Sequence, residues 1–160
     1  MNNKTSFITK SALIAAIYVI LTYITNLFGL ANGAIQVRIS EAMTVLPYFT
    51  ASAVPGLFLG CLISNLVTGC TIADIVFGSL ATLLGAVGTR ALRRYKYLAP
   101  LPPIVANMLI IPPVLMLAAG VEQGWLYLVL TIGIGEVLSC GVLGIALLKA
   151  LDKKAEFLFD

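Results

Sequence analysis

The residues best suited to ligand chemistry stand close together as Gln36, Arg38 and Glu41, beside long apolar segments. A carboxylate accepts hydrogen bonds, whereas a guanidinium and an amide donate them, so the group can hold a polar small molecule. A charge at the centre of a bilayer costs about 2.5–3.5 kcal/mol on insertion scales, so such residues are normally kept for a partner or a ligand. The stretch therefore predicts a binding site. The plainer interpretation is a surface ion pair between Arg38 and Glu41 at a helix start, with Ser40 as N-cap.

A further carboxylate, Glu136, lies deep inside a long apolar segment. It follows Trp125 by eleven residues, which is about 16 Å at a helical rise of ~1.5 Å per residue. That depth is near the middle of a ~30 Å hydrocarbon core. A carboxylate there has to be protonated, paired or bound to a ligand, so we interpret Glu136 as a functional residue.

Other polar side chains are candidates for the same site, each with a structural alternative. Asn65 can bind a ligand or join two helices by a hydrogen bond, and we favour the second role for Asn107. Asp74 can line the site or cap a helix start. The remaining polar or aromatic residues near the apolar segments are assigned to a solvated loop and an interfacial aromatic belt: Glu122, Trp125 and Tyr127.

Composition decides the class of protein. Of 160 residues, 60% are hydrophobic and 11% are charged, whereas soluble domains carry about 25% charged residues. We predict an all-α integral membrane bundle that forms a single domain over residues 1–160. The net charge of +3 comes from short basic clusters at helix ends, which favours contact with anionic lipid over binding to nucleic acid. The first apolar segment lacks a clear small-residue cleavage site, so no cleavable signal peptide is expected.

The chemistry that the sequence lacks is also informative. It has no histidine, which excludes Ser–His and Cys–His nucleophiles and histidine metal sites. It has no phosphate-binding loop of the G-x-x-x-x-G-K-[ST] type. The three cysteines are an odd number in apolar surroundings and indicate neither a zinc site nor a disulfide framework. We expect no enzyme, no catalytic residues, no metal and no cofactor, and any ATP-driven step belongs to another subunit.

Six apolar segments can be read from the sequence, and the basic residues orient them. With a cytoplasmic N-terminus and six spans, nine of the ten basic residues fall on the cytoplasmic side, and only Arg38 lies outside. Both termini are then cytoplasmic, and the polar candidates line a pocket that faces outward. The second and third segments are short for a span of about 20 residues, so Pro55-Gly56 is predicted as the inner turn of a hairpin. The segments are 7–28, 42–54, 55–67, 72–89, 101–120 and 125–148.

The first apolar segment carries Ala12 and Ala16, a pair of small residues four positions apart. Such pairs allow close approach of another helix within a membrane. We predict that they dock a second membrane subunit, and the alternative is packing within the chain's own bundle.

Four stretches carry a family resemblance: QVRISEA at 36–42, TVLPYF at 44–49, PGLFLGC at 55–61 and DIVFGSLATLL at 74–84. With these stretches, a six-helix chain of this size and an Ala-x-x-x-Ala first helix, the protein resembles the substrate-binding S component of an energy-coupling-factor (ECF) transporter. Within that group it closely resembles the QueT family. The likeness covers nearly the whole chain and is specific from Gln36 to Leu84.

The resemblance implies uptake of queuosine precursors, which are deazaguanine bases, across the cell membrane by a multi-pass S component. It also implies partners that hydrolyse ATP, namely one transmembrane coupling subunit and two nucleotide-binding subunits. In such a site Glu136 or Glu41 can accept the N–H and amine of a guanine-like edge, as a bidentate pair. Donors to the ring carbonyl would be Arg38, Asn65 or Gln36, and the rings available for stacking would be Tyr48, Phe49 or Trp125.

Two other classes of function stay open. One is a self-sufficient small-molecule transporter or channel for another nucleobase or vitamin, which needs no ATPase. The other is a structural or assembly protein of the membrane without a ligand, against which the grouped polar residues argue.

Overall fold

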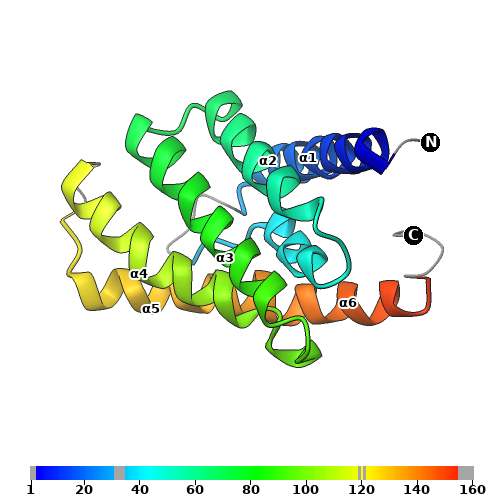
Figure 1. Cartoon of the computed structure of the whole chain (residues 1–160). Coiled ribbons are helices and arrows are strands. Elements are labelled where there is room, and N and C mark those ends of the chain that lie inside the picture. Colours follow the sequence, from blue (N-terminus) through cyan, green and yellow to red (C-terminus); the bar gives the residue numbers. More distant parts are fainter. Residues whose placement is uncertain (1–2, 31–34, 119, 121, 155–160) are drawn as a thin grey trace.

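Helices, joined by turns and short irregular segments, build the described structure, a computed structural model shown in Figure 1. It describes residues 3–30, 35–118, 120 and 122–154, and this part of the chain contains no strand. In chain order the elements are α1 (Asn3–Leu27), the 3-10 helix η1 (Ile39–Tyr48), α2 (Ala53–Val67), the π-helical turn η2 (Asp74–Gly78) leading into α3 (Ser79–Ala91), the 3-10 turn η3 (Lys96–Leu98), α4 (Leu101–Ala118), and α5 (Trp125–Glu136), which continues through the π-helical η4 (Val137–Leu143) into α6 (Gly144–Asp152).

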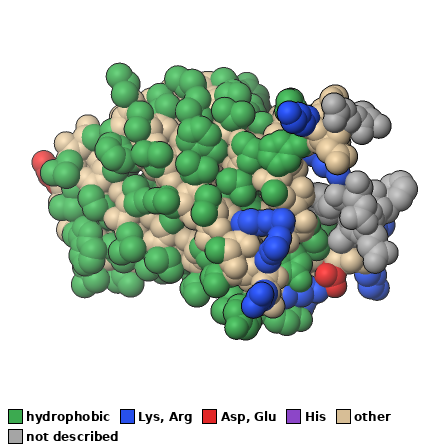
Figure 2. All heavy atoms as spheres, viewed as in Figure 1, with side chains coloured by type: hydrophobic (Ala, Val, Ile, Leu, Met, Phe, Trp, Pro, Cys, Tyr) green, Lys and Arg blue, Asp and Glu red, His purple; other side chains and the backbone are tan. Residues whose placement is uncertain are grey.

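The polarity of the bundle is that of a membrane protein. Three helices are long and apolar enough to cross a membrane, namely Asn3–Leu27, Lys96–Ala118 and Trp125–Asp152, and Ala53–Val67 is a shorter apolar helix. The exposed surface is largely hydrophobic (Figure 2). The inner side of α1 is instead partly polar, because its buried positions include Ser11, Tyr18, Thr22 and Thr25. Apolar side chains thus face outward to lipid, and hydrogen-bonding groups face the interior of the bundle.

Small residues bring α1 and α2 into close contact. A Cβ atom at Gly56 would lie 2.8 Å from the Ser11 carbonyl oxygen, and one at Gly60 would lie 2.8 Å from Tyr18 Cβ. The Ser11 hydroxyl also donates a hydrogen bond to the Ser52 carbonyl at 2.9 Å. Glycine at these positions lets the backbones approach, as is usual between membrane helices.

The hairpin turn lies earlier in the chain than the sequence predicts. The chain reverses over residues 49–52, and α2 begins at Ala53, so the prediction of Pro55-Gly56 as the turn is wrong. Proline is tolerated in the first turn of a helix because its missing N–H has no intrahelical partner there. Gly56 is needed for the contact with α1 rather than for the turn.

The second apolar segment folds as the 3-10 helix η1, which is buried between the other helices (Figure 1). A 3-10 helix rises about 2.0 Å per residue, so its ten residues extend over roughly 20 Å. Its last carbonyls are satisfied by α3, because Arg90 Nη1 donates to the Pro47 carbonyl at 3.1 Å and to the Tyr48 carbonyl at 3.4 Å. A short segment therefore spans much of the bundle and carries Glu41 near its beginning.

Candidate functional site

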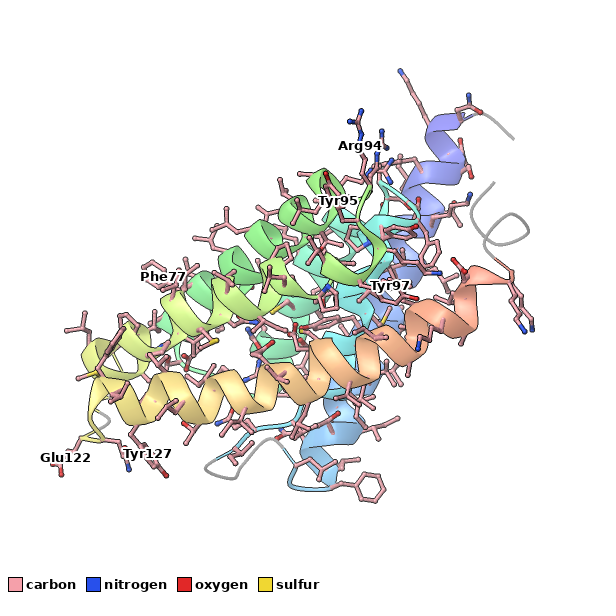
Figure 3. All side chains as sticks on the ribbon, turned by 90° about the horizontal axis from the view of Figure 1, so that it is seen from below. Phe77, Arg94, Tyr95, Tyr97, Glu122 and Tyr127 are labelled. Carbon is pink, nitrogen blue, oxygen red and sulfur yellow. The ribbon has the colours of Figure 1, made fainter. Side chains whose placement is uncertain are left out.

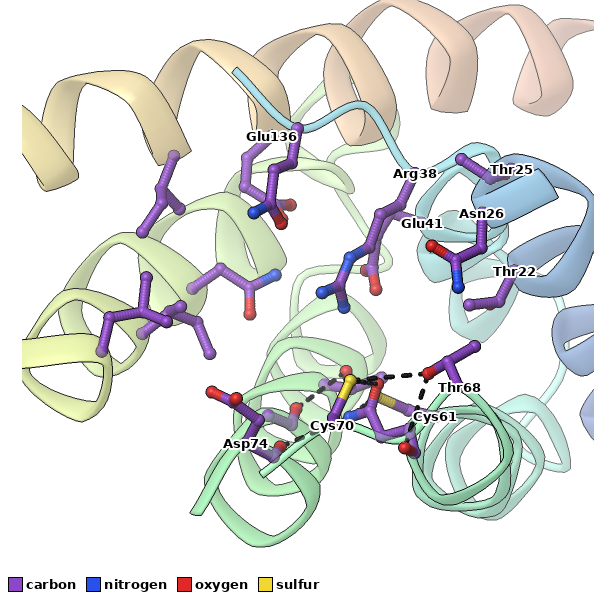
Figure 4. A pocket seen from close by; sticks show the side chains of 18 of the residues that line it. Thr22, Thr25, Asn26, Arg38, Glu41, Cys61, Thr68, Cys70, Asp74 and Glu136 are labelled. Carbon is purple, nitrogen blue, oxygen red and sulfur yellow. Dashed lines mark hydrogen bonds between the residues drawn. The ribbon is translucent and has the colours of Figure 1, made fainter. Parts of the chain in front are cut away.

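A cavity of about 740 Å³ lies between the helices and is lined mainly by polar side chains. Cavities that bind small molecules usually measure about 300–1,000 Å³. The walls come from α1, the segment before η1, η1 itself, α2, η2, α3, α4 and α5 (Figure 4). Of the residues predicted to bind substrate, all but Tyr48 line it: Gln36, Arg38, Glu41, Asn65, Asp74 and Glu136.

Glu41, in the first turn of η1, is 2% exposed and lines the cavity (Figure 4). Its Oε1 accepts a hydrogen bond from the hydroxyl of Tyr18 on α1. Its Oε2 has no hydrogen-bond partner among the described residues. An unsatisfied buried polar group costs about 1–3 kcal/mol, and more when it is charged. The second oxygen is therefore available to accept a hydrogen bond from a ligand.

Arg38 enters the cavity from the segment before η1. It is the N-cap residue of η1, and its backbone N–H donates to Ser139 Oγ at 3.0 Å. Its guanidinium extends into the cavity beside Glu41 (Figure 4) and makes no ion pair within the described part of the chain. The alternative of a surface ion pair capped by Ser40 is therefore wrong. The Ser40 hydroxyl instead accepts a hydrogen bond from Thr22 Oγ1 at 2.8 Å.

The segment before η1, which carries Gln36 and Arg38, passes very close to α5. A Cβ atom at Gly135 would collide with the backbone carbonyl of Gln36. Only glycine allows this approach without moving the neighbouring backbone. Gly135 directly precedes Glu136, the last residue of α5. The close contact therefore holds the segment before η1 against the end of α5, next to Glu136.

Glu136 and Glu41 approach each other although they come from distant parts of the chain (Figure 4). A carboxylate oxygen of each and the Cys140 Sγ all lie within 4.8 Å of one another. Cys140 Sγ donates to Glu136 Oε2 at 3.1 Å. Asn107, for which the sequence favours an interhelical hydrogen bond, also lines the cavity.

Asn65 and Asp74 form the part of the cavity wall built by α2 and η2. Asn65 is 3% exposed, and its Nδ2 donates to the Asp74 backbone carbonyl at 3.3 Å. Thr71 Oγ1 donates to Asp74 Oδ2 at 2.8 Å and accepts from the Asp74 backbone N–H at 3.2 Å. Asn65 and Asp74 thus stabilise the start of η2 by hydrogen bonds and also line the cavity.

The aromatic residues lie differently from the stacking prediction. Tyr48 packs against the buried cluster of Val45, Ala99 and Leu148, with the Phe49 ring edge-on at 4.9 Å, and neither ring lines the cavity. Tyr48 follows Glu41 by seven positions of the 3-10 helix, which is about 14 Å at a rise of ~2.0 Å. Trp125 is half exposed and is not part of the wall either. The tyrosine that lines the cavity is Tyr127, near the end of the bundle that carries Glu122 (Figure 3).

A profile of the QueT transporter family matches residues 8–153 of this chain. The chain belongs to the QueT transporter family. It is also 38% identical, over 63 residues, to the queuosine precursor transporter QueT of Lactococcus lactis subsp. cremoris (strain MG1363). That alignment spans 39% of this chain and 37% of the relative's length. No solved structure matches the chain. Family and apolar helices together assign this chain to membrane transporters with several spans.

Several cavity residues of this QueT-family chain were not predicted from its sequence. The two residues behind the wall that donate to its carboxylates were not predicted either: Tyr18 donates to Glu41, and Cys140 donates to Glu136. A polar stripe at helical spacing on the first apolar segment was the available signal, since Ser11, Tyr18, Thr22 and Thr25 share its buried side. Further lining residues outside the predicted set are Asn26, Thr68, Cys70, Thr82, Gln123 and Thr131.

The grouping of Glu41, Glu136 and Cys140 is also the one place in the described residues where acidic and thiol groups lie near enough to share a metal ion. The thiol is already engaged, because it donates to Glu136 and contacts the Glu41 carbonyl at 3.5 Å. The Arg38 guanidinium lines the same cavity and repels a divalent cation. The arrangement thus favours a hydrogen-bonding ligand.

Proposed function

We propose that this chain is the substrate-binding membrane subunit of an ECF-type importer and captures a queuosine precursor, a deazaguanine base, from outside the cell membrane. The observation that carries the proposal is the unpaired, buried Oε2 of Glu41, in a cavity that also contains Glu136 and Arg38. Membership of the QueT transporter family and the name of the lactococcal relative support this substrate class.

The residues suit a guanine-like ring in three ways. Its N–H and amine donate to the carboxylates of Glu41 and Glu136, and its carbonyl accepts from Arg38, with charge-assisted hydrogen bonds at both edges. Tyr127 supplies an aromatic face, and stacking of a base on such a face contributes about 1–3 kcal/mol. Asn65 and Gln36 complete the polar wall.

The proposed topology has six spans, formed by α1, η1, α2, η2 with α3, α4, and α5 with η4 and α6. All Lys and Arg residues except Arg38 belong to segments near the end of the bundle where α1 begins and α6 ends (Figures 1 and 2). Arg94 lies at that end and Glu122 at the opposite one (Figure 3). By the positive-inside rule the basic end is cytoplasmic, so both termini are inside.

The energy source in this proposal is a separate module with a transmembrane coupling subunit and two ATPase subunits. Ala12 and Ala16 are exposed on α1, whereas Ser11, Ala15 and Tyr18 on the same helix are buried against the bundle. The alanine pair leaves a shallow groove in which a helix of the coupling subunit can pack closely.

Two measurements test the proposal. The purified chain is titrated calorimetrically with a deazaguanine base, a nucleoside and a vitamin, and only the deazaguanine is expected to bind. Vesicles containing the chain with its coupling module are expected to accumulate the base on addition of ATP, whereas vesicles with the chain alone are not. Failure of every deazaguanine to bind contradicts the substrate class, and uptake by the chain alone identifies a self-sufficient transporter instead.

A further inference from the structure

The turn between α3 and α4, residues 92–98, projects from the bundle at its basic end (Figures 1 and 2). The candidate span Lys96–Ala118 begins in this turn. The candidate span Trp125–Asp152 ends beside it, because Lys96 Nζ lies 2.6 Å from Asp152 Oδ2. Since one span begins where another ends, the turn lies at the boundary between the hydrocarbon core and the lipid headgroups.

Two of the four basic residues in this turn and directly before it are engaged within the protein. Arg90 donates to two backbone carbonyls at the end of η1, at 3.1 and 3.4 Å. Lys96 forms the ion pair with Asp152. The backbone after the turn is held as well, since Thr89 Oγ1 donates to the Ala99 carbonyl at 2.8 Å. These contacts fix the turn against η1 and α6.

The other two basic residues of the turn, Arg93 and Arg94, are exposed, and neither forms an ion pair within the described part of the chain. Figure 3 shows the Arg94 side chain pointing away from the bundle. A guanidinium presents five N–H donors in a planar fork that matches the oxygens of a phosphate group. The turn therefore presents two adjacent phosphate donors that the protein itself does not use.

Aromatic and apolar side chains surround these two arginines. Tyr95, Tyr97 and Leu98 are 61%, 66% and 43% exposed. Tyrosine is enriched at the membrane interface, where its hydroxyl meets the headgroups and its ring meets the upper part of the acyl chains. A soluble phosphate compound would use the arginines and leave this apolar surface in water. A phospholipid uses both, because it carries a phosphate and acyl chains in one molecule.

We propose that the turn of residues 92–98 is a binding site for an anionic phospholipid. Arg93 and Arg94 donate to its phosphate, and Tyr95, Tyr97 and Leu98 contact its glycerol backbone and the upper part of its acyl chains. The sequence associates all the basic clusters with anionic lipid in a general way, whereas the structure singles out this turn, in which unpaired arginines and exposed aromatic rings occur together.

The test uses the full-length chain in detergent, titrated with phosphatidylglycerol or with phosphatidylcholine of the same acyl chains. Native mass spectrometry measures the bound lipid. Phosphatidylglycerol is expected to bind at least tenfold tighter, the effect of two arginines near an anionic headgroup. The double variant Arg93→Gln, Arg94→Gln is expected to lose this preference. The matched control Lys153→Gln, Lys154→Gln removes the same charge from exposed residues after α6 and is expected to keep it.

Four outcomes would overturn the proposal. Equal affinity of the wild-type chain for the two lipids is the first, and it needs no variant to fold. An equal loss in the two double variants would assign the preference to net charge. Displacement of the lipid by glycerol phosphate, which lacks acyl chains, would identify a site for a soluble phosphate compound. Unchanged lipid binding in the arginine variant, with loss of co-purification with the proposed coupling module, would identify a protein-docking surface.

Discussion

The hydroxyl of Tyr18 on α1 donates a hydrogen bond to Glu41 Oε1 on η1. The tyrosine ring passes close to α2 at Gly60, where a Cβ atom would lie 2.8 Å from Tyr18 Cβ. The contact holds one carboxylate oxygen at the wall and leaves the other without a protein partner in the described structure. The first helix lines the cavity with neutral residues only, and through Tyr18 it fixes the orientation of the Glu41 carboxylate.

Replacement of Tyr18 by phenylalanine tests this role. The variant leaves both oxygens of a buried carboxylate without a partner, so its free energy of unfolding is expected to fall by about 1.5–3 kcal/mol. Denaturant unfolding of the detergent-solubilised protein measures the change. Tyr23→Phe is the matched control, because Tyr23 lies half exposed on the same helix. A similar loss in both variants would contradict the assignment.

Replacement of Gly135 by alanine tests the close crossing of the segment that carries Arg38. The added Cβ collides with the Gln36 carbonyl, so residues 35–38 have to move, and the affinity for a deazaguanine base is expected to fall at least tenfold. A titration with the purified variant measures this. In Gly133→Ala the added Cβ meets the end of the flexible Met108 side chain, 2.9 Å from Cε, which can rotate away. Equal affinity of the two variants would show that the crossing does not position the site.

The two faces of α1 give opposite expectations for two neighbouring alanines. Ala16→Trp is expected to abolish co-purification with the proposed coupling subunit while ligand binding continues, because Ala16 is exposed. Ala15→Trp is expected to abolish folding, because Ala15 is 7% exposed and packs inside the bundle. Loss of ligand binding in Ala16→Trp would instead assign the alanine pair to the chain's own packing.

Arg90 is expected to stabilise the C-terminal end of η1. Arg90→Met removes the donor to the Pro47 and Tyr48 carbonyls, so the free energy of unfolding should fall by about 1–3 kcal/mol. Arg93→Met removes an exposed arginine of the same cluster and should change the stability little. Denaturant unfolding of both variants decides the point, and an equal loss would assign the effect to net charge.

The sequence predicts the charged part of the cavity better than its neutral part. Arg38, Glu41 and Glu136 were identifiable because a charge in apolar surroundings needs a partner. Tyr18 and Cys140 carry no such signal, since a tyrosine and a cysteine in an apolar segment are equally suited to packing. Their roles depend on which helices are neighbours, and the sequence pattern does not contain that information.

The same limit applies to the fold. Apolar runs and glycine or proline breaks predict the helical segments, yet they do not distinguish the 3-10 helix η1 from an α-helix of similar composition. Pro55-Gly56 has the composition of a turn, but packing against α1 uses it inside a helix. Tyr48 has the right chemistry for stacking and lies at the wrong end of η1.

The backbone of Arg38 and its hydrogen-bond partner Ser139 are 101 positions apart in the chain. Ribosomes add about 5–20 residues per second, so Arg38 and Glu41 are synthesised roughly 5–20 s before the helix that closes their side of the cavity. During that interval the two charges lack Glu136, Ser139 and Cys140 as neighbours. The cavity is therefore among the last parts of the molecule to be completed, and a chain that stops before α5 lacks Glu136 and one wall of the cavity.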